Sequence, residues 1–402
     1  MVRKFFNNLS QKMSQLCAYL YVRFDSLYQA HNLLLLYINE HRKHGKTILL
    51  MSHEMSLTGA PRALFNLALI LKKNGFHVIF ASSVHGPLEK IELVPSGIPF
   101  KLLSIPKTDS TYHISQSLKK YISSFDMILF NTIATIPLVE GIADVKIKKV
   151  CWIHEGSYGF KFSPYKSQFP ILYRHFDKLF VVGDYARRIA CSFGEKDIKM
   201  ESLIYGIDDI PCSPQNKNIE NEKVVMVLAG SIEERKGQQV LLDSLSLLSA
   251  EIIAQLDIYL IGNTLDKKIE TLLRESAYDC LKLMGVMQHN HLLDLFKRMD
   301  ILLCPSLDDP MPIVCTEAMM LSKPIIVSDC TGTASFINDG ENGYIVKGGD
   351  AHSLALAIEK AVQSKKLLPA LGEKARRVFE SNFTNEAFEQ RLKEKLIPVI
   401  YS

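Results

Sequence analysis

The feature that most constrains this chain is an alternation of short apolar runs with longer amphipathic segments, which begins at residue 46. Runs that are apolar throughout are typical of parallel strands covered by helices on both faces. The longer segments, such as Ala60–Asn74, have the spacing of helices that cover such a sheet. Residues 46–210 are therefore predicted to form a Rossmann-like α/β domain. Its expected strands include Thr47–Met51, His77–Ala81, Met127–Phe130, Val150–Ile153 and Leu179–Val182.

The same alternation restarts after a polar interruption. Residues 211–222 contain two prolines and three asparagines, which is typical of a linker. Residues 223–384 then predict a second α/β domain, and Thr384 is a candidate N-cap for a last helix over residues 385–402. Two α/β sheets joined by a short linker leave a ligand cleft at the carboxyl ends of their strands. The expected strands of the second sheet include Val224–Leu228, Ile258–Ile261, Leu281–Met284, Ile301–Cys304 and Ile325–Val327.

The composition excludes several classes of protein. A chain of 402 residues with 47% hydrophobic residues has the material for two or three folded domains, so it is not disordered. The net charge of +4 is too small to indicate a nucleic-acid partner. Eight cysteines without C-x-x-C spacing favour free thiols and a cytoplasmic location. The longest apolar run near the N-terminus, Leu33–Ile38, is too short to span a membrane.

Residues 1–45 form a basic extension with apolar side chains at helical spacing, among them Leu9, Met13, Leu16 and Leu20. This period predicts an amphipathic helix, or two. Its Lys and Arg side chains and its many aromatic rings are typical of a helix that lies on a membrane surface. A helix packed on the body of the protein has the same period. Both alternatives stay open: packing, or peripheral contact of residues 1–44 with the cytoplasmic face of a membrane.

The first candidate site follows the predicted strand Val224–Leu228. Gly230 marks a turn, and Arg235 and Lys236 come just before the next helix. Two cations beside the free amides of a helix N-terminus suit a diphosphate, because Arg can grip phosphate oxygens with two N–H groups and Lys adds a point charge. A solvated loop balanced by Glu233 and Glu234 is the alternative.

The second candidate site is a pair of acids, Asp309 at the exit of a strand and Glu317 eight residues later. If both lay on one helix, they would lie on nearly the same face and could look into one cleft. Each carboxylate can accept hydrogen bonds from paired sugar hydroxyls. The alternative is a turn acid or helix cap for Asp309 and a surface residue for Glu317, but Glu317 lies among apolar residues, and a buried acid needs partners.

Two segments of the first domain complete the candidate cleft. His53 to Pro61 follow the first strand, and Gly59 there would let backbone amides approach a phosphate or sugar closely. His154 ends another strand, where it can contact a ligand or serve only as a sheet-end residue. The chain lacks D-x-D, H-E-x-x-H, Walker A, G-x-G-x-x-G and G-x-S-x-G motifs. We therefore expect no metal site, no cofactor and no simple hydrolase chemistry.

From Lys46 to about Phe383 these segments resemble glycosyltransferase family 4, a group of retaining, nucleotide-sugar-dependent enzymes. The most specific stretch is Leu303–Asp329, followed by Ile337–Val346. The resemblance implies the GT-B fold, in which two Rossmann-like domains face a cleft and the final helix returns to the first domain. It also implies transfer of a sugar from a nucleoside diphosphate sugar to a saccharide or lipid-linked saccharide, as in the assembly of bacterial surface polysaccharides or glycolipids.

The resemblance also implies roles for the candidate residues. Arg235 and Lys236 would bind the donor diphosphate in place of a metal. Asp309 would hold donor-sugar hydroxyls and Glu317 the ribose of the nucleotide, while Gly59 and His154 would face the phosphate and sugar from the first domain. The catalytic set is thus Arg235, Lys236, Asp309 and His154, and the donor-binding set adds Gly59, Gly230, Pro312, Ile313, Val314 and Glu317.

The chain departs from the family pattern at three points. Asp309 stands where the family usually has the longer glutamate, and Pro312, which has no N–H, stands where glycine is common. A glycine pair with a downstream acid is replaced by Thr331-Gly332-Thr333. We interpret these departures as substrate tuning. Two alternatives remain, a nucleotide-sugar epimerase of similar fold and a catalytically silent donor-binding or scaffold subunit.

Overall fold

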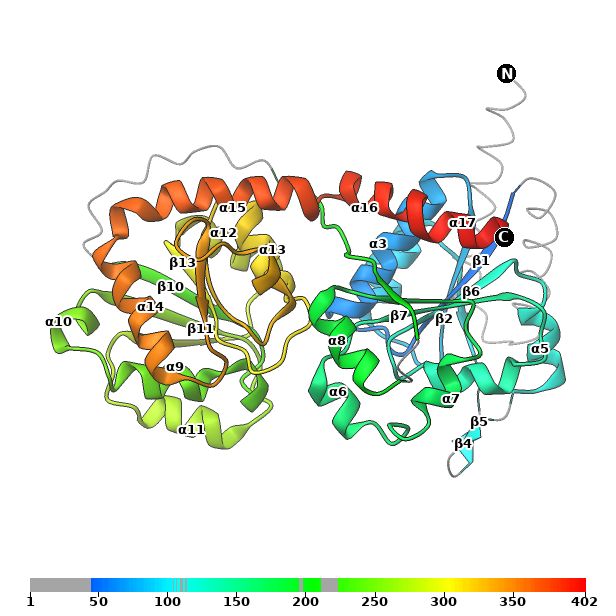
Figure 1. The fold of residues 1–402 in the computed structure, drawn as a ribbon, viewed down its shortest axis with the longest axis horizontal. Helices are drawn as coiled ribbons and strands as arrows, with labels where there is room; N and C mark the ends of the chain where they lie inside the picture. The colour runs from blue at the N-terminus through cyan, green and yellow to red at the C-terminus, as the bar shows by residue number, and fades with distance from the viewer. Residues whose placement is uncertain are drawn as a thin grey trace, which may run out of the picture.

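The computed structural model describes residues 45–210, except for 104, 106, 109–110, 113 and 195–197, and residues 223–402. Two parallel sheets lie next to each other along the long axis of the molecule (Figure 1). The expected α/β architecture with two Rossmann-like domains is confirmed. The predicted linker 211–222 and the predicted amphipathic helix over residues 1–44 lie outside the described residues.

The first sheet contains the five predicted strands and two more at its edges. Its order is β3-β2-β1-β6-β7-β8-β9, so the strand order reverses between β1 and β6. Burial explains the apolar runs, because every residue of β1 and of β6 is buried. A separate small hairpin pairs β4 (Lys107–Thr108) with β5 (Thr111–Tyr112). The strands are β1 Thr47–Ser52, β2 His77–Ser82, β3 Phe100–Leu102, β6 Met127–Asn131, β7 Lys148–Ile153, β8 Lys178–Val181 and β9 Met200–Ser202.

The second sheet repeats this plan. Its order is β12-β11-β10-β13-β14-β15, and the reversal lies between β10 and β13. All of its strand pairs are parallel. Ligands of open parallel sheets bind at such a reversal, outside the carboxyl ends of the strands. The strands are β10 Val224–Ala229, β11 Leu256–Ile261, β12 Leu281–Gly285, β13 Ile301–Cys304, β14 Ile325–Ser328 and β15 Gly343–Val346.

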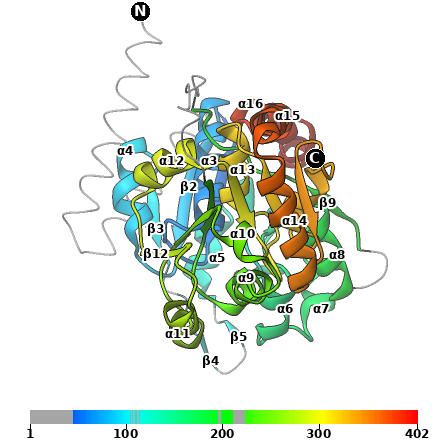
Figure 2. The ribbon, with the colours of Figure 1, turned by 90° about the vertical axis from the view of Figure 1, so that its left-hand side faces the viewer.

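Helices cover both faces of the second sheet. Figures 1 and 2 show α9, α11 and α14 on one face and α12, α13 and α15 on the other. The helices of the first domain are α3 Gly59–Lys73, α4 Val94–Ser96, α5 Gln116–Ile122, α6 Ser157–Phe162, α7 Phe169–Tyr173 and α8 Asp184–Ser192. Those of the second are α9 Gln238–Leu245, α10 Ala250–Ile253, α11 Lys267–Glu275, α12 His289–Arg298, α13 Ile313–Met320, α14 Ala351–Gln363 and α15 Leu368–Asn382.

The chain ends on the first domain. After α15 it crosses back and forms α16 (Asn385–Arg391), a π-helical turn (Leu392–Leu396) and α17 (Ile397–Tyr401), as Figure 1 shows in red. At the crossing, the Asn66 side chain donates hydrogen bonds to the Gly206 carbonyl (2.7 Å) and the Asn385 side chain (2.6 Å). Phe388 is fully buried, and its ring centroid lies 5.8 Å from that of Trp152. The last helices therefore share the core of the first domain.

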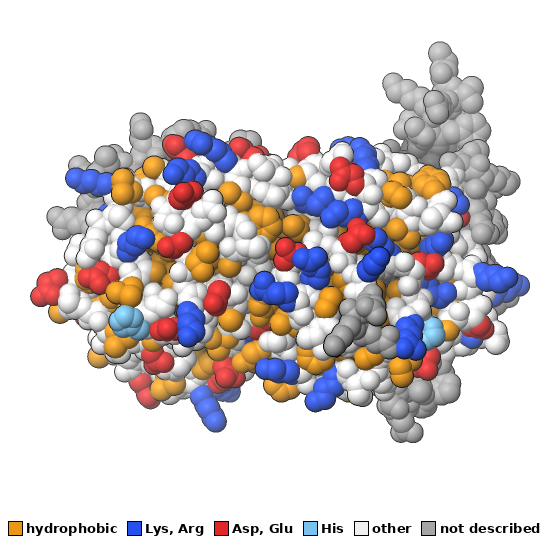
Figure 3. All heavy atoms as spheres, viewed as in Figure 1, with side chains coloured by type: hydrophobic (Ala, Val, Ile, Leu, Met, Phe, Trp, Pro, Cys, Tyr) orange, Lys and Arg blue, Asp and Glu red, His pale blue; other side chains and the backbone are white. Residues whose placement is uncertain are grey.

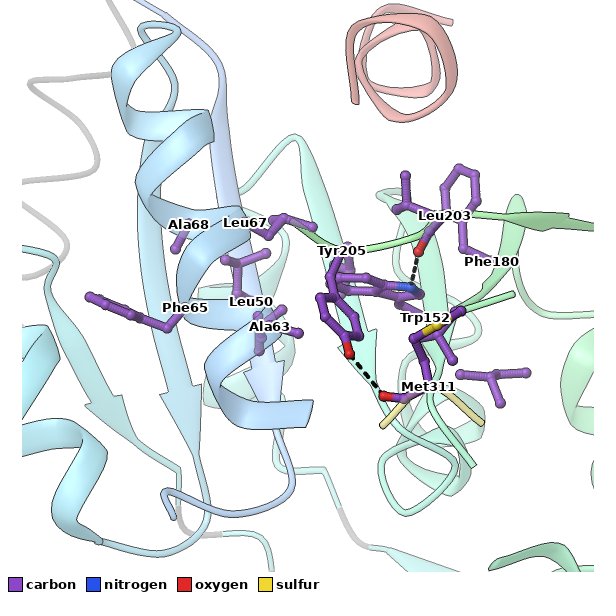
Figure 4. Packing of buried hydrophobic residues seen from close by; sticks show 14 of the residues in the cluster. Leu50, Ala63, Phe65, Leu67, Ala68, Trp152, Phe180, Leu203, Tyr205 and Met311 are labelled. Atoms are coloured by element: carbon purple, nitrogen blue, oxygen red, sulfur yellow. Dashed lines mark hydrogen bonds between the residues drawn. The ribbon is translucent and has the colours of Figure 1, made fainter. Parts of the chain in front are cut away.

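Tyr205 joins this core to the second domain, and Trp152 holds the segment that carries Tyr205. The Trp152 indole donates to the Leu203 carbonyl (3.0 Å), and the Tyr205 hydroxyl donates to the Met311 carbonyl (2.8 Å), as Figure 4 shows. The second bond crosses from the first domain to the loop after β13. Both bonds satisfy buried polar groups, and the second one links the two domains. Among the described residues, no helix is long and apolar enough to cross a membrane.

The docking of the last helices predicts a large effect of Phe388→Ala. Removing a fully buried Phe side chain leaves a cavity, so we expect a loss of about 3–5 kcal/mol in the free energy of unfolding. The measurement is urea unfolding followed by the fluorescence of Trp152, the single tryptophan. The control is Phe162→Ala, because Phe162 is 79% exposed. Equal effects of the two substitutions would contradict the docking.

Candidate active site

A cleft of about 610 Å³ lies between the two domains. It is open at the carboxyl ends of β1 and β7 in the first domain and of β10 and β13 in the second. Both strand-order reversals face it, which is the ligand-binding position of such sheets. Nine of the ten residues predicted for the site line this cleft: Gly59, His154, Gly230, Arg235, Lys236, Asp309, Pro312, Ile313 and Val314.

The cationic side of the cleft is the short 3₁₀ turn Glu234–Lys236 after β10. Arg235 donates to the Asp308 carbonyl (3.1 Å) and the Glu233 carboxylate (2.8 Å), and its guanidinium lies 3.7 Å from Asp309. The turn ends at Gly237 with φ of 76°, where a Cβ would lie 2.1 Å from the Pro305 carbonyl oxygen. Only glycine therefore lets the turn pack against the β13 loop, which keeps both cations in the cleft.

Lys236 and Asp309 form a mostly buried ion pair, with 2.6 Å between Nζ and Oδ2. Burial lowers the pKa of Lys236, but the Asp309 carboxylate outweighs it and the net pKa is raised. The lysine is therefore charged at neutral pH. A buried charge is tolerated only with a partner, and Asp309 is the partner of Lys236.

The loop after β13 fixes Asp309 by its backbone. The amide of Asp309 donates to the Cys330 carbonyl (3.1 Å), and its carbonyl accepts from the Gly332 amide (2.9 Å). A Cβ at Gly332 would lie 1.7 Å from the Pro310 carbonyl oxygen. The single glycine retained in Thr331-Gly332-Thr333 is thus the one that the close approach of these two loops needs.

The first domain contributes two histidines with unpaired nitrogens. His154 Nε2 and His53 Nδ1 are buried and have no hydrogen-bond partner among the described residues. Burial, and then the neighbouring His53, lower the pKa of His154 to about 3. At neutral pH His154 is therefore an uncharged imidazole that can donate to or accept from a hydroxyl group.

Two family profiles match the two domains in turn. Residues 44–162 match "Glycosyl-transferase family 4" and residues 209–378 match "Glycosyl transferases group 1". The chain belongs to glycosyltransferase family 4. The predicted family is thereby confirmed, and with it the predicted GT-B fold.

Curated relatives of this family 4 protein include two that it matches over part of their length. It is 24% identical to the capsular polysaccharide biosynthesis glycosyltransferase CapM of Staphylococcus aureus, over 47% of this chain and 50% of CapM. It is also 24% identical to the lipopolysaccharide 1,2-N-acetylglucosaminetransferase of Salmonella typhimurium, over 45% of this chain and 50% of the relative. The chain thus spans about half the length of these relatives.

Solved structures share the fold over both domains. Anabaena HepE in complex with UDP and glucose superposes with a TM-score of 0.73 at 17% identity, covering 88% of this chain and 100% of HepE. Sucrose-phosphate synthase from Thermosynechococcus elongatus superposes with a TM-score of 0.68 at 17% identity, covering 89% and 99%. At this identity the likeness shows the GT-B fold and nothing about the ligand.

Glu317 is the one predicted residue that does not line the cleft, and the spacing argument for it was wrong. Helix α13 begins only at Ile313, so Asp309 and Glu317 do not share a helix. Glu317 is buried about one turn after the helix start, and its carboxylate pairs with His289 Nε2 at 2.6 Å. His289 begins α12, 28 residues upstream, and no spacing in the sequence relates the two.

Glu155 is a partly buried acid of the cleft that the sequence did not single out. One of its carboxylate oxygens accepts from the amides of Ile133 (3.1 Å) and His154 (3.0 Å), so it holds the loop that carries His154. Burial raises its pKa to about 7, against the opposing effect of these hydrogen bonds. The only signal was its position directly after a histidine at a strand end.

The raised pKa of Glu155 makes stability depend on pH in a definite direction. Between about pH 4.5 and 7 the folded protein keeps a proton on Glu155 that the unfolded chain has lost. Stability therefore falls as pH rises through this window, by about 3 kcal/mol in total. Glu155→Gln keeps an acceptor for both amides but cannot titrate.

The unfolding free energy of the wild type minus that of Glu155→Gln should therefore decrease between about pH 4.5 and 7 and stay constant above pH 7. Urea unfolding at a series of pH values measures it. A difference that does not change with pH would show that Glu155 is ionised throughout.

Proposed function

We propose that this protein transfers a sugar from a nucleoside diphosphate sugar to a saccharide or lipid-linked saccharide acceptor, with retention at the anomeric carbon. The observation that carries the proposal is the convergence of Arg235 and Lys236 with Asp309 and His154 in one cleft between two Rossmann-like sheets. Retention is taken from the family. HepE, which shares this fold, was solved in complex with UDP and glucose, and we extend a nucleotide-sugar donor to this chain as part of the proposal.

The two cations supply the main catalytic effect. Breaking the bond between sugar and diphosphate places negative charge on the leaving oxygen. Arg235 and Lys236 are fixed before the donor arrives, so their attraction to that charge grows in the transition state without reorganisation. The leaving phosphate oxygen then accepts the proton of the acceptor hydroxyl, and no separate base is required.

The start of helix α13 completes the phosphate site. Pro312 is the N-cap residue, and its missing N–H is no loss there. Ile313 and Val314 follow as the first helical residues, whose amides have no partner within the helix and suit a phosphate oxygen. Gly230, whose φ of 155° favours glycine, shapes the loop after β10, which lines the same cleft as Ile313 and Val314. On the other side, Gly59 at the start of α3 lies opposite Ile313, with 3.6 Å from an added Cβ to Cδ1.

The sugar lies between Asp309 and His154 in this proposal. Asp309 exchanges part of its contact with Lys236 for sugar hydroxyls, and His154 offers its unpaired nitrogen from the other domain. Glu317 holds the ribose hydroxyls once the ring of His289, which is half-exposed, turns aside. Asp309 is one methylene shorter than a glutamate. It therefore leaves more room in the cleft, which favours a donor sugar that extends further towards the Asp309 carboxylate.

The acceptor and the cellular setting are proposed from the relatives. CapM is named for capsular polysaccharide biosynthesis, and the Salmonella relative for lipopolysaccharide. We propose a related role in bacterial surface polysaccharide or glycolipid assembly in the cytoplasm, with peripheral contact to the membrane. Figure 3 shows cations and anions interspersed on the face it presents, which does not favour nucleic acid on that face.

Alanine at either cation tests the phosphate site. Arg235→Ala and Lys236→Ala should each lower kcat by roughly 100-fold or more, as the loss of a group that acts in the transition state does. Release of nucleoside diphosphate at saturating donor is the measurement. Lys268→Ala, on the exposed side of α11, is the control and should keep the wild-type rate. Wild-type rates in both cation variants would contradict the assignment.

Incubation with the donor alone separates the alternatives. An epimerase converts the donor without an acceptor, and a silent subunit binds it without releasing nucleoside diphosphate. A screen of common nucleotide sugars, with and without short saccharide acceptors, should give acceptor-dependent release for one donor. Conversion without acceptor would instead favour the epimerase.

Two protein cations at the diphosphate also predict a rate that does not depend on a divalent metal. Among the described residues, no cluster of three or more His, Cys, Asp or Glu is arranged to hold one. A metal acting as the phosphate clamp would be removed by EDTA. We expect EDTA to leave the transfer rate unchanged, and restoration of a lost rate by added Mg²⁺ or Mn²⁺ would overturn this expectation.

A further inference from the structure

Asp308, the neighbour of the donor-site acid, reaches across the cleft to the first domain. Its carboxylate accepts from the amides of Ser157 (3.0 Å) and Tyr158 (2.8 Å) and from the Tyr185 hydroxyl (2.7 Å). The side chain is almost completely buried. All three donors belong to the first domain, and Asp308 belongs to the second.

The donors explain why this contact is strong. Ser157 and Tyr158 are the first two residues of α6, whose amides have no partner within the helix. A carboxylate at this end also meets the positive end of the helix dipole. Tyr185 adds a third bond from the start of α8. These three bonds satisfy the buried Asp308 carboxyl group. Among the described residues, no Lys or Arg side chain forms an ion pair with it.

Gly156 is shaped by the same contact. A Cβ at this position would lie 2.0 Å from Asp308 Oδ1, and its three nearest atoms all belong to the Asp308 carboxyl group. The backbone of Gly156 has φ of −98°, which any residue adopts. The need for glycine here therefore comes from the room that Asp308 takes and not from the local backbone.

Asp308 is also tied to the donor site on its own side. Its carbonyl accepts from Arg235 (3.1 Å), and the next residue, Asp309, pairs with Lys236. A shift of this loop on donor binding would move both acids together. Tyr158 and Gly156 line the cleft, so the same shift would reach the surface that faces the acceptor.

We propose that Asp308 is a positioning residue: its carboxylate holds helix α6 against the donor loop and so keeps the cleft in the closed form in which sugar transfer takes place. This rests on the proposed function for its role in catalysis, but the closure itself can be measured without turnover. Water can replace all three bonds when the domains part, so the contact is reversible.

A double-mutant cycle between Gly156 and Asp308 tests the proposal. Gly156→Ala adds a methyl group whose three nearest atoms are those of the Asp308 carboxyl group, so it should break the contact, as Asp308→Ala does. Each single variant should lower kcat by about ten- to a hundredfold, as a misplaced reacting group does. The dissociation constant for UDP should not change, because Arg235 and Lys236 are untouched. The double variant should be no slower than Asp308→Ala.

Closure is measured separately by small-angle X-ray scattering with UDP present. The wild type should be more compact than Gly156→Ala and Asp308→Ala, and Tyr185→Phe, which loses one bond of three, should lie between. Asp329→Ala is the matched control, because this carboxylate accepts from the Gly348 amide (2.8 Å) within the second domain. It should keep both the compact form and the wild-type kcat.

The outcomes separate the two proposals. Additive losses of kcat in the double variant, or equal compactness of all variants, would overturn the positioning role of Asp308. If no nucleotide sugar supported transfer by the wild type, the proposed function would fail, while scattering would still decide whether Asp308 closes the cleft.

Discussion

The buried ion pair between Lys236 and Asp309 is the interaction on which the rest of the structure depends. The two residues come from the loops after β10 and β13, which are neighbours at the point where the strand order of the second sheet reverses. Neither charge could be buried there alone, so the pair holds the two loops together. In the proposed function, this pair presents the positive charge that would meet the diphosphate of the donor.

The sequence was sufficient for the centres of both sheets and for the edge strand β12, but not for the edge strands β3 and β9 of the first sheet. Central strands such as β1 and β10 are buried throughout and read as unbroken apolar runs. The edge strands β3 and β9 are only three residues long, and each is partly open to solvent, so neither left a clear pattern. A short edge strand is defined by its pairing with a neighbour, which periodicity along the chain does not record.

In the site, local signals were read correctly and contacts between distant segments were not. Arg235 and Lys236 were found because two cations between the end of a buried strand and the start of a helix indicate an anion site from adjacent residues alone. Glu317 was assigned to the cleft by helical spacing, but the helix begins after Asp309, and its partner His289 comes from another element. The role of Glu155 depends on the loop after β6, which lies beside it only in the folded chain.

The room that Gly156 leaves for Asp308 has a consequence for recombination between related enzymes. GT-B proteins are two-part scaffolds, and joining the acceptor half of one to the donor half of another is an obvious route to new products. In this chain the two halves are fitted to each other at position 156, where a glycine of the first domain leaves room for the Asp308 carboxyl group of the second. A transplanted first domain with any side chain at position 156 would clash with the Asp308 carboxyl group at the domain interface. Chimeras built on this scaffold must therefore inherit positions 156 and 308 together.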